Sequence, residues 1–230
     1  QHFYTPFLLA VDELYHKIRN LKYRYIVDGT LFPEEVDQYD PYIIREALSN
    51  AIAHQDYRLG GRITVVEKED STLTFQNYGS FLPVSIENVI LNDAPEQKYR
   101  NTFLVNAMMQ LNLIDTIGSG IRRMFLKQKE KFFPMPDYSF ENNRVQVKFT
   151  GKVLSMDYAR KLAELPDLSL TNIIALDQVQ KNQLISDDDA AELRKKGLIE
   201  GRKPNYCISA NVAEQTDQQA EYLEMRGLDD

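Results

Sequence analysis

Two segments near the start of the chain alternate apolar and polar residues with the period of a helix. Thr5 and Pro6 form an N-cap and first-turn pair, and apolar residues then recur three or four positions apart to about residue 20. Residues 40–55 repeat the pattern, with Asp40 as the cap and Pro41 in the first turn. Both segments are predicted to be amphipathic helices.

Short runs of β-branched and aromatic residues predict strands. Residues 23–27 and 30–32 flank Asp28-Gly29, a dipeptide favoured in two-residue hairpins because both positions adopt positive φ. Further elements are expected as strands at 62–67, 71–77, 137–140 and 144–149 and as helices at about 102–112 and 120–131. The last strand pair is joined across Asn142-Asn143. Helices and antiparallel hairpins in this order, without βαβ alternation, predict an α+β two-layer sandwich.

The pattern changes after Gly151, and we expect a first domain at 1–152 and a second at 153–210. In the second, helices near 157–165, 169–178 and 186–196 precede the turn-rich stretch 197–209, which ends in a short strand. A compact unit of this size is a plausible separate domain. Residues 211–230 carry one basic and six acidic side chains, which predicts a loose surface helix or a disordered tail.

Composition is that of a folded, soluble protein, with 43% hydrophobic and 27% charged residues. No apolar stretch approaches the roughly 18 residues of a membrane-spanning helix. The single cysteine, Cys207, rules out an intrachain disulfide and suits a reducing cytoplasm. With 27 basic and 34 acidic residues the net charge is −7, so any contact with nucleic acid must use a local basic patch. Because the chain starts with Gln1, we expect it to be part of a longer protein.

Candidate chemistry lies first on the predicted helix at 40–55. Glu46, Asn50 and His54 stand at i, i+4 and i+8, so a carboxylate, an amide and an imidazole share one face. On an isolated helix such a stripe is more often a solvated polar surface. A functional interpretation therefore needs support from elsewhere in the chain.

That support comes from two glycine-containing turns. Asn77 and Gly79 end a predicted strand, and Gly118-Ser119-Gly120 opens a helix that continues into Arg122. Glycines at a helix start allow backbone N–H groups and the positive end of the helix dipole to approach a phosphate. A long polar lid, residues 83–101, lies between the two turns.

The combination resembles the GHKL ATP-binding fold shared by gyrase B, histidine kinases and MutL. The likeness is strongest to a divergent branch in bacterial and archaeal transcriptional regulators, often labelled RecG-related helicases, in which a Schlafen AlbA-like domain precedes the ATPase-like domain. It covers about residues 5–150 and is carried by 45–57 (REALSNAIAHQDY), 75–83 (FQNYGSFLP) and 113–123 (LIDTIGSGIRR).

The resemblance implies ATP and magnesium as cofactors, with Glu46 activating the attacking water and Asn50 holding the metal ion. These roles suit a carboxylate base and a neutral amide oxygen. Where the family has an aspartate that accepts from the adenine amino group, this chain has Asn77, which implies that adenine binding is weaker or absent and that hydrolysis is slow at best. The implied nucleotide site further includes His54, Gly79, Gly118, Gly120 and Arg122.

Other enzyme classes lack their motifs. A helicase motor needs a GxxxxGK[ST] phosphate loop, but the only Gly-Lys pair, Gly151-Lys152, is followed by Val153. A Ser-His-Asp hydrolase of the GxSxG type is excluded because that motif is absent.

Residues 193–204 (LRKKGLIEGRKP) resemble the winged helix that closes many of these regulators. This implies contacts to DNA phosphates through Arg194, Lys195, Lys196, Arg202 and Lys203. An acidic helix start at 187–189 is unfavourable for reading bases, so an interaction or dimerisation module is an equal alternative.

Two functions thus remain open. The first is a transcriptional regulator that couples a GHKL-type ATP-binding domain to a winged helix. The second is a non-enzymatic scaffold, such as a homodimer, whose ATPase fold has lost its nucleotide.

Overall fold

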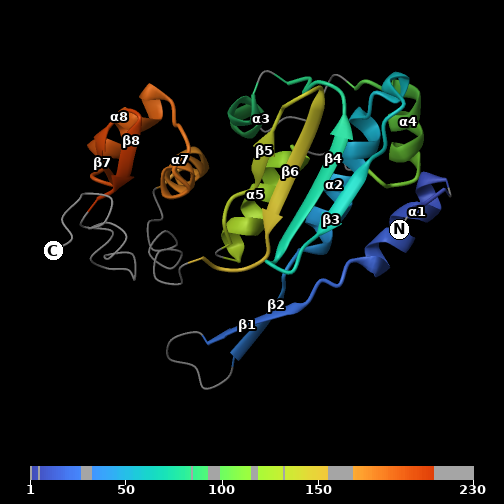
Figure 1. The fold of residues 1–230 in the computed structure, drawn as a ribbon, viewed down its shortest axis with the longest axis horizontal. Coiled ribbons are helices and arrows are strands. Elements are labelled where there is room, and N and C mark those ends of the chain that lie inside the picture. The colour runs from blue at the N-terminus through green and yellow to red at the C-terminus, as the bar shows by residue number, and fades with distance from the viewer. Residues whose placement is uncertain are drawn as a thin grey trace. The chain divides into compact units, whose positions relative to one another are not determined.

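The protein is described by a computed structural model that covers residues 2–4, 6–26, 33–83, 85–92, 99–114, 119–131, 133–154 and 168–209. The chain divides into two compact units (Figure 1). Unit 1 comprises Gln1–Lys131 and Pro136–Lys152, and unit 2 comprises Phe132–Met135 and Val153–Asp230. The mixed α+β class predicted from the sequence is confirmed.

Unit 1 is built on a four-stranded antiparallel sheet with the order β3-β4-β6-β5. The strands are β3 Thr64–Glu67, β4 Thr72–Tyr78, β5 Asp137–Ser139 and β6 Arg144–Thr150, close to the predicted ranges. Asn142 and Asn143 have φ values of 53° and 55° in the turn between β5 and β6. Positive φ at both central residues is the geometry of a tight two-residue hairpin turn.

Helices pack against one face of this sheet, and in Figure 1 α2 and α5 pass behind it. The helices of unit 1 are α1 Phe7–Lys17, α2 Pro41–His54, α3 Ile86–Asn92, α4 Thr102–Gln110 and α5 Gly120–Glu130. Strand β4 turns Leu73, Phe75 and Asn77 inward, and α2 buries its apolar residues against this face. The inward row therefore places one polar side chain, Asn77, at the edge of an apolar core.

The N-terminal hairpin differs from its prediction. Strands β1 Lys22–Ile26 and β2 Pro33–Asp37 pair antiparallel with Ile26 opposite Pro33. The turn predicted at Asp28-Gly29 and the strand predicted at 30–32 both fall in the segment between these strands. Residues 27–32 lie outside the described residues. The observed register sets Lys22 opposite Asp37 and Arg24 opposite Glu35, and each pair forms a salt bridge. Opposite charges on facing residues favour this register.

The predicted polar lid at 83–101 contains a helix, α3, that the sequence analysis missed. Ile86 and Ile90 are spaced four apart and are buried, which is the signal of an amphipathic turn. The Ser85 hydroxyl accepts from the backbone N–H of Asn88 near the start of this helix. Residues 84 and 93–98 of the segment are outside the described part of the chain.

In unit 2, helices α7 Leu170–Gln180 and α8 Asp187–Lys195 are followed by a hairpin of β7 Ile199–Arg202 and β8 Asn205–Ile208. Ser169 and Ser186 cap the two helices by accepting from the backbone N–H groups of Asn172 and Asp189. The helix expected near 157–165 and the tail at 211–230 fall outside the described residues. Within the described ranges, none of the helices has both the length and the apolarity needed to span a bilayer.

Candidate functional site

A pocket in unit 1 opens between α2, the N-terminal end of α5 and the inner face of the sheet. Four side chains singled out in the sequence line it, namely Glu46, Asn50, His54 and Asn77, together with Gly120. The cavity volume is about 90 Å³, well below the roughly 300–1,000 Å³ typical of small-molecule sites. A ligand the size of a nucleotide therefore requires the pocket walls to move apart.

Glu46 and Asn50 are in direct contact on the wall formed by α2. The Asn50 Nδ2 group donates to Glu46 Oε1 at 3.1 Å, as the i, i+4 spacing allows, and Glu46 is 7% exposed. The predicted polar stripe is thus turned into a pocket and is not a solvated surface.

The start of α5 presses against the Glu46 carboxylate. A Cβ atom built on Gly120 would lie 1.8 Å from Glu46 Oε1, so only glycine leaves room for the carboxylate. The positive end of the helix dipole faces a negative group at this contact, which is a favourable arrangement. Ser119 caps the helix by accepting from the backbone N–H of Arg122.

His54 closes the pocket at the C-terminal end of α2. Burial, with a smaller contribution from the positive charge of Arg100, lowers the pKa of the imidazole to about 4. The ring stacks on Tyr99 with 5.6 Å between centroids and an interplanar angle of 26°. At neutral pH the His54 ring is therefore uncharged, so it offers a flat stacking face and no positive charge with which to bind a phosphate.

Asn77 is 5% exposed and its Nδ2 group donates to the backbone carbonyl of Tyr78 at 3.2 Å. This contact directs the amide nitrogen to the strand end. The side-chain oxygen is then the atom able to accept from a ligand.

The other predicted site residues lie elsewhere. Gly79 has φ of +125° and sits against the guanidinium of Arg100, outside the pocket lining. Arg122 donates through Nη1 to the carbonyl of Ile90 at 3.0 Å and does not line the pocket either. Gly118 is outside the described residues.

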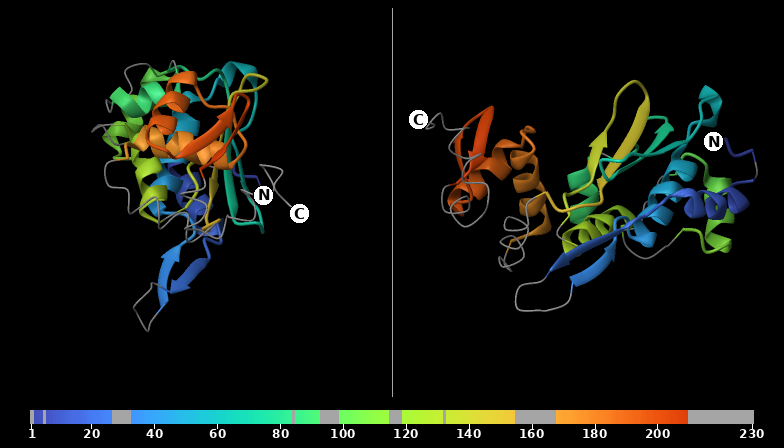
Figure 2. Two further views of the ribbon diagram at one scale, coloured as in Figure 1. Left: turned by 90° about the vertical axis from the view of Figure 1, so that its left-hand side faces the viewer. Right: turned by 60° about the horizontal axis from the view of Figure 1, so that its bottom comes forward.

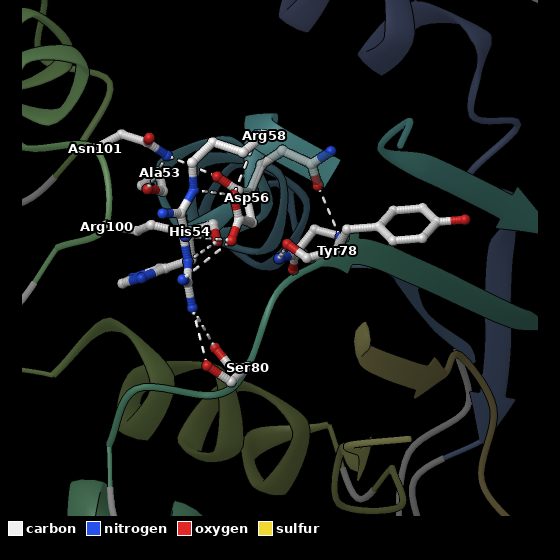
Figure 3. Close-up of polar contacts among 10 residues, drawn as sticks. Ala53, His54, Asp56, Arg58, Tyr78, Ser80, Arg100 and Asn101 are labelled. Carbon is white, nitrogen blue, oxygen red and sulfur yellow. Dashed lines mark hydrogen bonds and ion pairs between the residues drawn. The ribbon is translucent and has the colours of Figure 1, made fainter. Parts of the chain in front are cut away.

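Sequence reasoning missed the segment Tyr99–Asn101, which contacts both the end of α2 and the turn after β4 (Figure 3). Its residues carry no motif, and they were read only as part of a polar lid. A stretch of Tyr, Arg and Asn next to a helix N-cap gives no sequence signal of these long-range contacts.

The basic residues of unit 2 gather at the end of α8 and on the adjoining hairpin, where acidic groups and carbonyls of the same unit contact several of them. Lys203 Nζ lies 2.9 Å from Asp187 Oδ1, and Lys196 Nζ lies 3.7 Å from Glu192 Oε1. Arg194 donates to the carbonyl of Gly201. In the described part of the chain, Lys195 and Arg202 form no ion pair.

Residues 61–149 match a family model described as "Putative ATP-dependent DNA helicase recG C-terminal". The matched segment is similar to this RecG-related family and makes up less than half of the chain. It runs from just before β3 to β6 and includes Asn77, Gly79, Gly118, Gly120 and Arg122. The helix with Glu46, Asn50 and His54 precedes it, so for those three residues the resemblance rests on the sequence pattern and their place in the pocket.

A solved structure has a similar fold, namely the crystal structure of the DIP2311 protein from Corynebacterium diphtheriae. The match has a TM-score of 0.58 and 21% sequence identity, and it covers 90% of this chain and 47% of that chain. This chain therefore spans about half the length of the matched protein, and the likeness shows the fold alone. No curated protein matches the chain.

We predict that Gly120→Ala destabilises unit 1, although alanine is favoured over glycine in a helix by about 1 kcal/mol. The added Cβ would collide with Glu46 Oε1 and force that carboxylate to shift. The free energy of unfolding, measured by urea denaturation, should fall. In a Glu46→Ala background the same Gly120→Ala change should be neutral or stabilising. Equal effects in both backgrounds would mean that the two groups do not touch.

Proposed function

We propose that unit 1 is a GHKL-type two-layer sandwich that binds an adenine nucleotide with magnesium in the pocket between α2, α5 and the sheet. The observation that carries the proposal is the contact of Glu46 with both Asn50 and the start of α5 inside that pocket. A general base, a metal ligand and a helix N-terminus are there within reach of one bound phosphate chain.

The chemistry of the donor set fits magnesium held together with phosphates. The described residues contain no cluster of three or more His, Cys, Asp or Glu side chains placed to hold a metal ion. Mg²⁺ in nucleotide sites commonly takes only one or two protein ligands and fills the others with water and phosphate oxygens. Asn50 supplies such a ligand, and the ion would neutralise phosphate charge beside the Glu46 carboxylate. Binding should therefore depend strongly on magnesium.

The adenine would lie between the neutral ring of His54 and the apolar wall of the pocket, with Asn77 Oδ1 accepting from its amino group. The pocket lining there includes Phe81, Leu82 and Val89. An amide acceptor lacks the charge of a carboxylate, so this bond is weaker than an aspartate would give.

We predict that ATP with magnesium binds and that Glu46→Ala abolishes any hydrolysis while leaving nucleotide bound, because loss of a general base affects the transition state more than the ground state. Titration calorimetry and phosphate release measure the two properties. A nucleotide at 100 times its Kd should add about 2.7 kcal/mol of stability. Glu130→Ala is the matched control, since this glutamate is exposed on α5. The absence of both heat and a thermal shift at millimolar ATP would overturn the proposal.

A second prediction concerns the base. Asn77→Asp should tighten the binding of ATP relative to GTP, because a carboxylate accepts a stronger, charge-assisted bond from the adenine amino group. Competition of the two nucleotides for the same site measures the ratio. An unchanged ratio would show that residue 77 does not contact the base.

The scaffold alternative is favoured by the small cavity. A pocket of about 90 Å³ is compatible with an ATPase fold that has lost its ligand and serves in homodimer formation. Sedimentation with and without ATP and magnesium separates the two functions: a dimer that is independent of nucleotide, in a protein that binds none, would support the scaffold.

For unit 2 we propose a winged helix that contacts duplex DNA, which would make the protein a transcriptional regulator. The supporting observation is that α7 and α8 precede the two-stranded hairpin and that basic residues cluster at the end of α8 and on that hairpin. The acidic partners of these basic residues within unit 2 limit the affinity for DNA. A phosphate must replace Asp187 at Lys203 and Glu192 at Lys196, so binding should be weak and sensitive to salt.

We predict that Asp187→Asn strengthens DNA binding more than Asp188→Asn does. Both changes remove one negative charge from the start of α8, but only Asp187 pairs with Lys203. Releasing that lysine for a phosphate should steepen the slope of log K against log salt by about 0.9. Fluorescence anisotropy with a random duplex at several salt concentrations measures it. Equal slopes in the two variants would exclude Lys203 as a phosphate contact.

A further inference from the structure

The side chain of Arg100 ties together two elements of unit 1 that carry pocket residues. Its Nε group donates to the carbonyl of His54 at 3.2 Å, and its Nη2 group donates to both the carbonyl and the hydroxyl of Ser80 at 3.0 and 3.1 Å. His54 is the last residue of α2, and Ser80 follows β4 by two positions. Figure 3 shows the guanidinium between them.

A carboxylate completes this set of contacts. Arg100 Nη1 lies 3.5 Å from Asp56 Oδ2, and the side chain of Arg100 is 17% exposed. Hydrogen bonds from Arg58 lower the pKa of Asp56 to about 2, so the partner of Arg100 is ionised throughout the physiological range. The guanidinium also lies at the negative, C-terminal end of α2, where a positive charge is stabilised.

The two neighbours of Arg100 contact the same helix end. Asn101 Nδ2 donates to the carbonyls of Ala53 and Gln55 at 3.0 and 2.8 Å, groups that a helix C-terminus leaves without helical partners. Tyr99 stacks on His54. Tyr99–Asn101, which we call the strap, thus holds the end of α2 through three consecutive side chains.

Gly79 makes room for the guanidinium. A Cβ at this position would stand 3.2 Å from Arg100 Nε and 3.3 Å from the His54 carbonyl oxygen, and the φ of +125° is unfavourable for other residues. The glycine of the strand-end turn therefore has a local role that involves no ligand. It lets an arginine reach a helix end and a turn at once.

We propose that Arg100 is a positioning residue of the pocket. It fixes the end of α2 relative to the turn after β4, and it thereby sets the distance between His54 and Ser80, which both face a bound nucleotide. The effect of Arg100 on nucleotide binding rests on the proposed nucleotide site. Its structural part, the attachment of the two elements by one guanidinium, can be tested without any nucleotide. A planar group with five N–H donors fits this geometry, whereas an ammonium cannot reach all the acceptors at once.

The test compares Arg100→Ala and Arg100→Lys with Arg58→Ala. Arg58 is the matched control because its guanidinium also pairs with Asp56, at 2.9 Å, but its side chain is 83% exposed. Among the described residues, its guanidinium donates to Asp56 and not to His54 or Ser80. The first readout is the pKa of His54 by NMR in the protein without nucleotide. The second is the Kd for ATP with magnesium from calorimetry. Thermal melts first establish that each variant is folded.

We expect both Arg100 variants to raise the pKa of His54 from about 4 toward its ordinary value, and Arg58→Ala to leave it unchanged. The lysine variant keeps the positive charge, so a rise of the His54 pKa in that variant shows that water reaches the imidazole when the strap shifts. Nucleotide binding should weaken about tenfold in both Arg100 variants, which corresponds to about 1.4 kcal/mol.

Three results would overturn the inference. One is a His54 pKa that stays near 4 in Arg100→Lys, which would mean that charge alone matters. Another is nucleotide affinity that is unchanged in both Arg100 variants. The third is an equal effect of Arg58→Ala. If the unaltered protein binds no nucleotide, the proposed function fails, and the His54 measurement alone then decides whether Arg100 holds the two elements. Arg100→Lys, which retains most of the side chain, carries the test should Arg100→Ala not fold.

Discussion

The contact between the Glu46 carboxylate and the first turn of α5 is the constraint on which unit 1 depends. It brings a buried charge against a helix N-terminus with no side chain between them, which fixes how closely α2 and α5 approach. Burying a carboxylate is costly unless it gains partners, and the amide of Asn50 and the dipole of α5 offset part of that cost. The pocket is the space that this close approach leaves above the inner face of the sheet.

Much of the fold was predictable because local patterns and tertiary packing agree. The caps at Asp40, Ser169 and Ser186, the inward row of β4 and the Asn142-Asn143 turn each combine a propensity with a burial pattern, and the observed elements begin and end close to the expected residues. The second strand of the N-terminal hairpin, at Pro33–Asp37, was not predicted, because its pairing with β1 places oppositely charged side chains opposite one another, which local propensity does not indicate.

The residues of the candidate site that lie on one helix were predictable. The contacts that join segments distant in the sequence were not. Their spacing of four positions along α2 is enough to place Glu46, Asn50 and His54 on a common face. No local rule indicates that Arg100 reaches the end of that helix, or that Gly79 faces a guanidinium while Gly120 faces a carboxylate. Both glycines were expected in the nucleotide site, yet in each case the absence of a Cβ leaves room for a charged side chain from another element.

The hairpin β1–β2 is a two-stranded arm that extends away from the sheet, as the views in Figure 2 show. Each of its strands therefore has an outer edge whose backbone groups could pair with a strand from another molecule. Lys22, Arg24, Glu35 and Asp37 place charges of both signs along the arm. A foreign strand that docked there would have to cover and desolvate those charges. The ion pairs that set the register of the hairpin thus also protect it from edge-to-edge aggregation, and since they are exposed, this protection should weaken as the salt concentration rises.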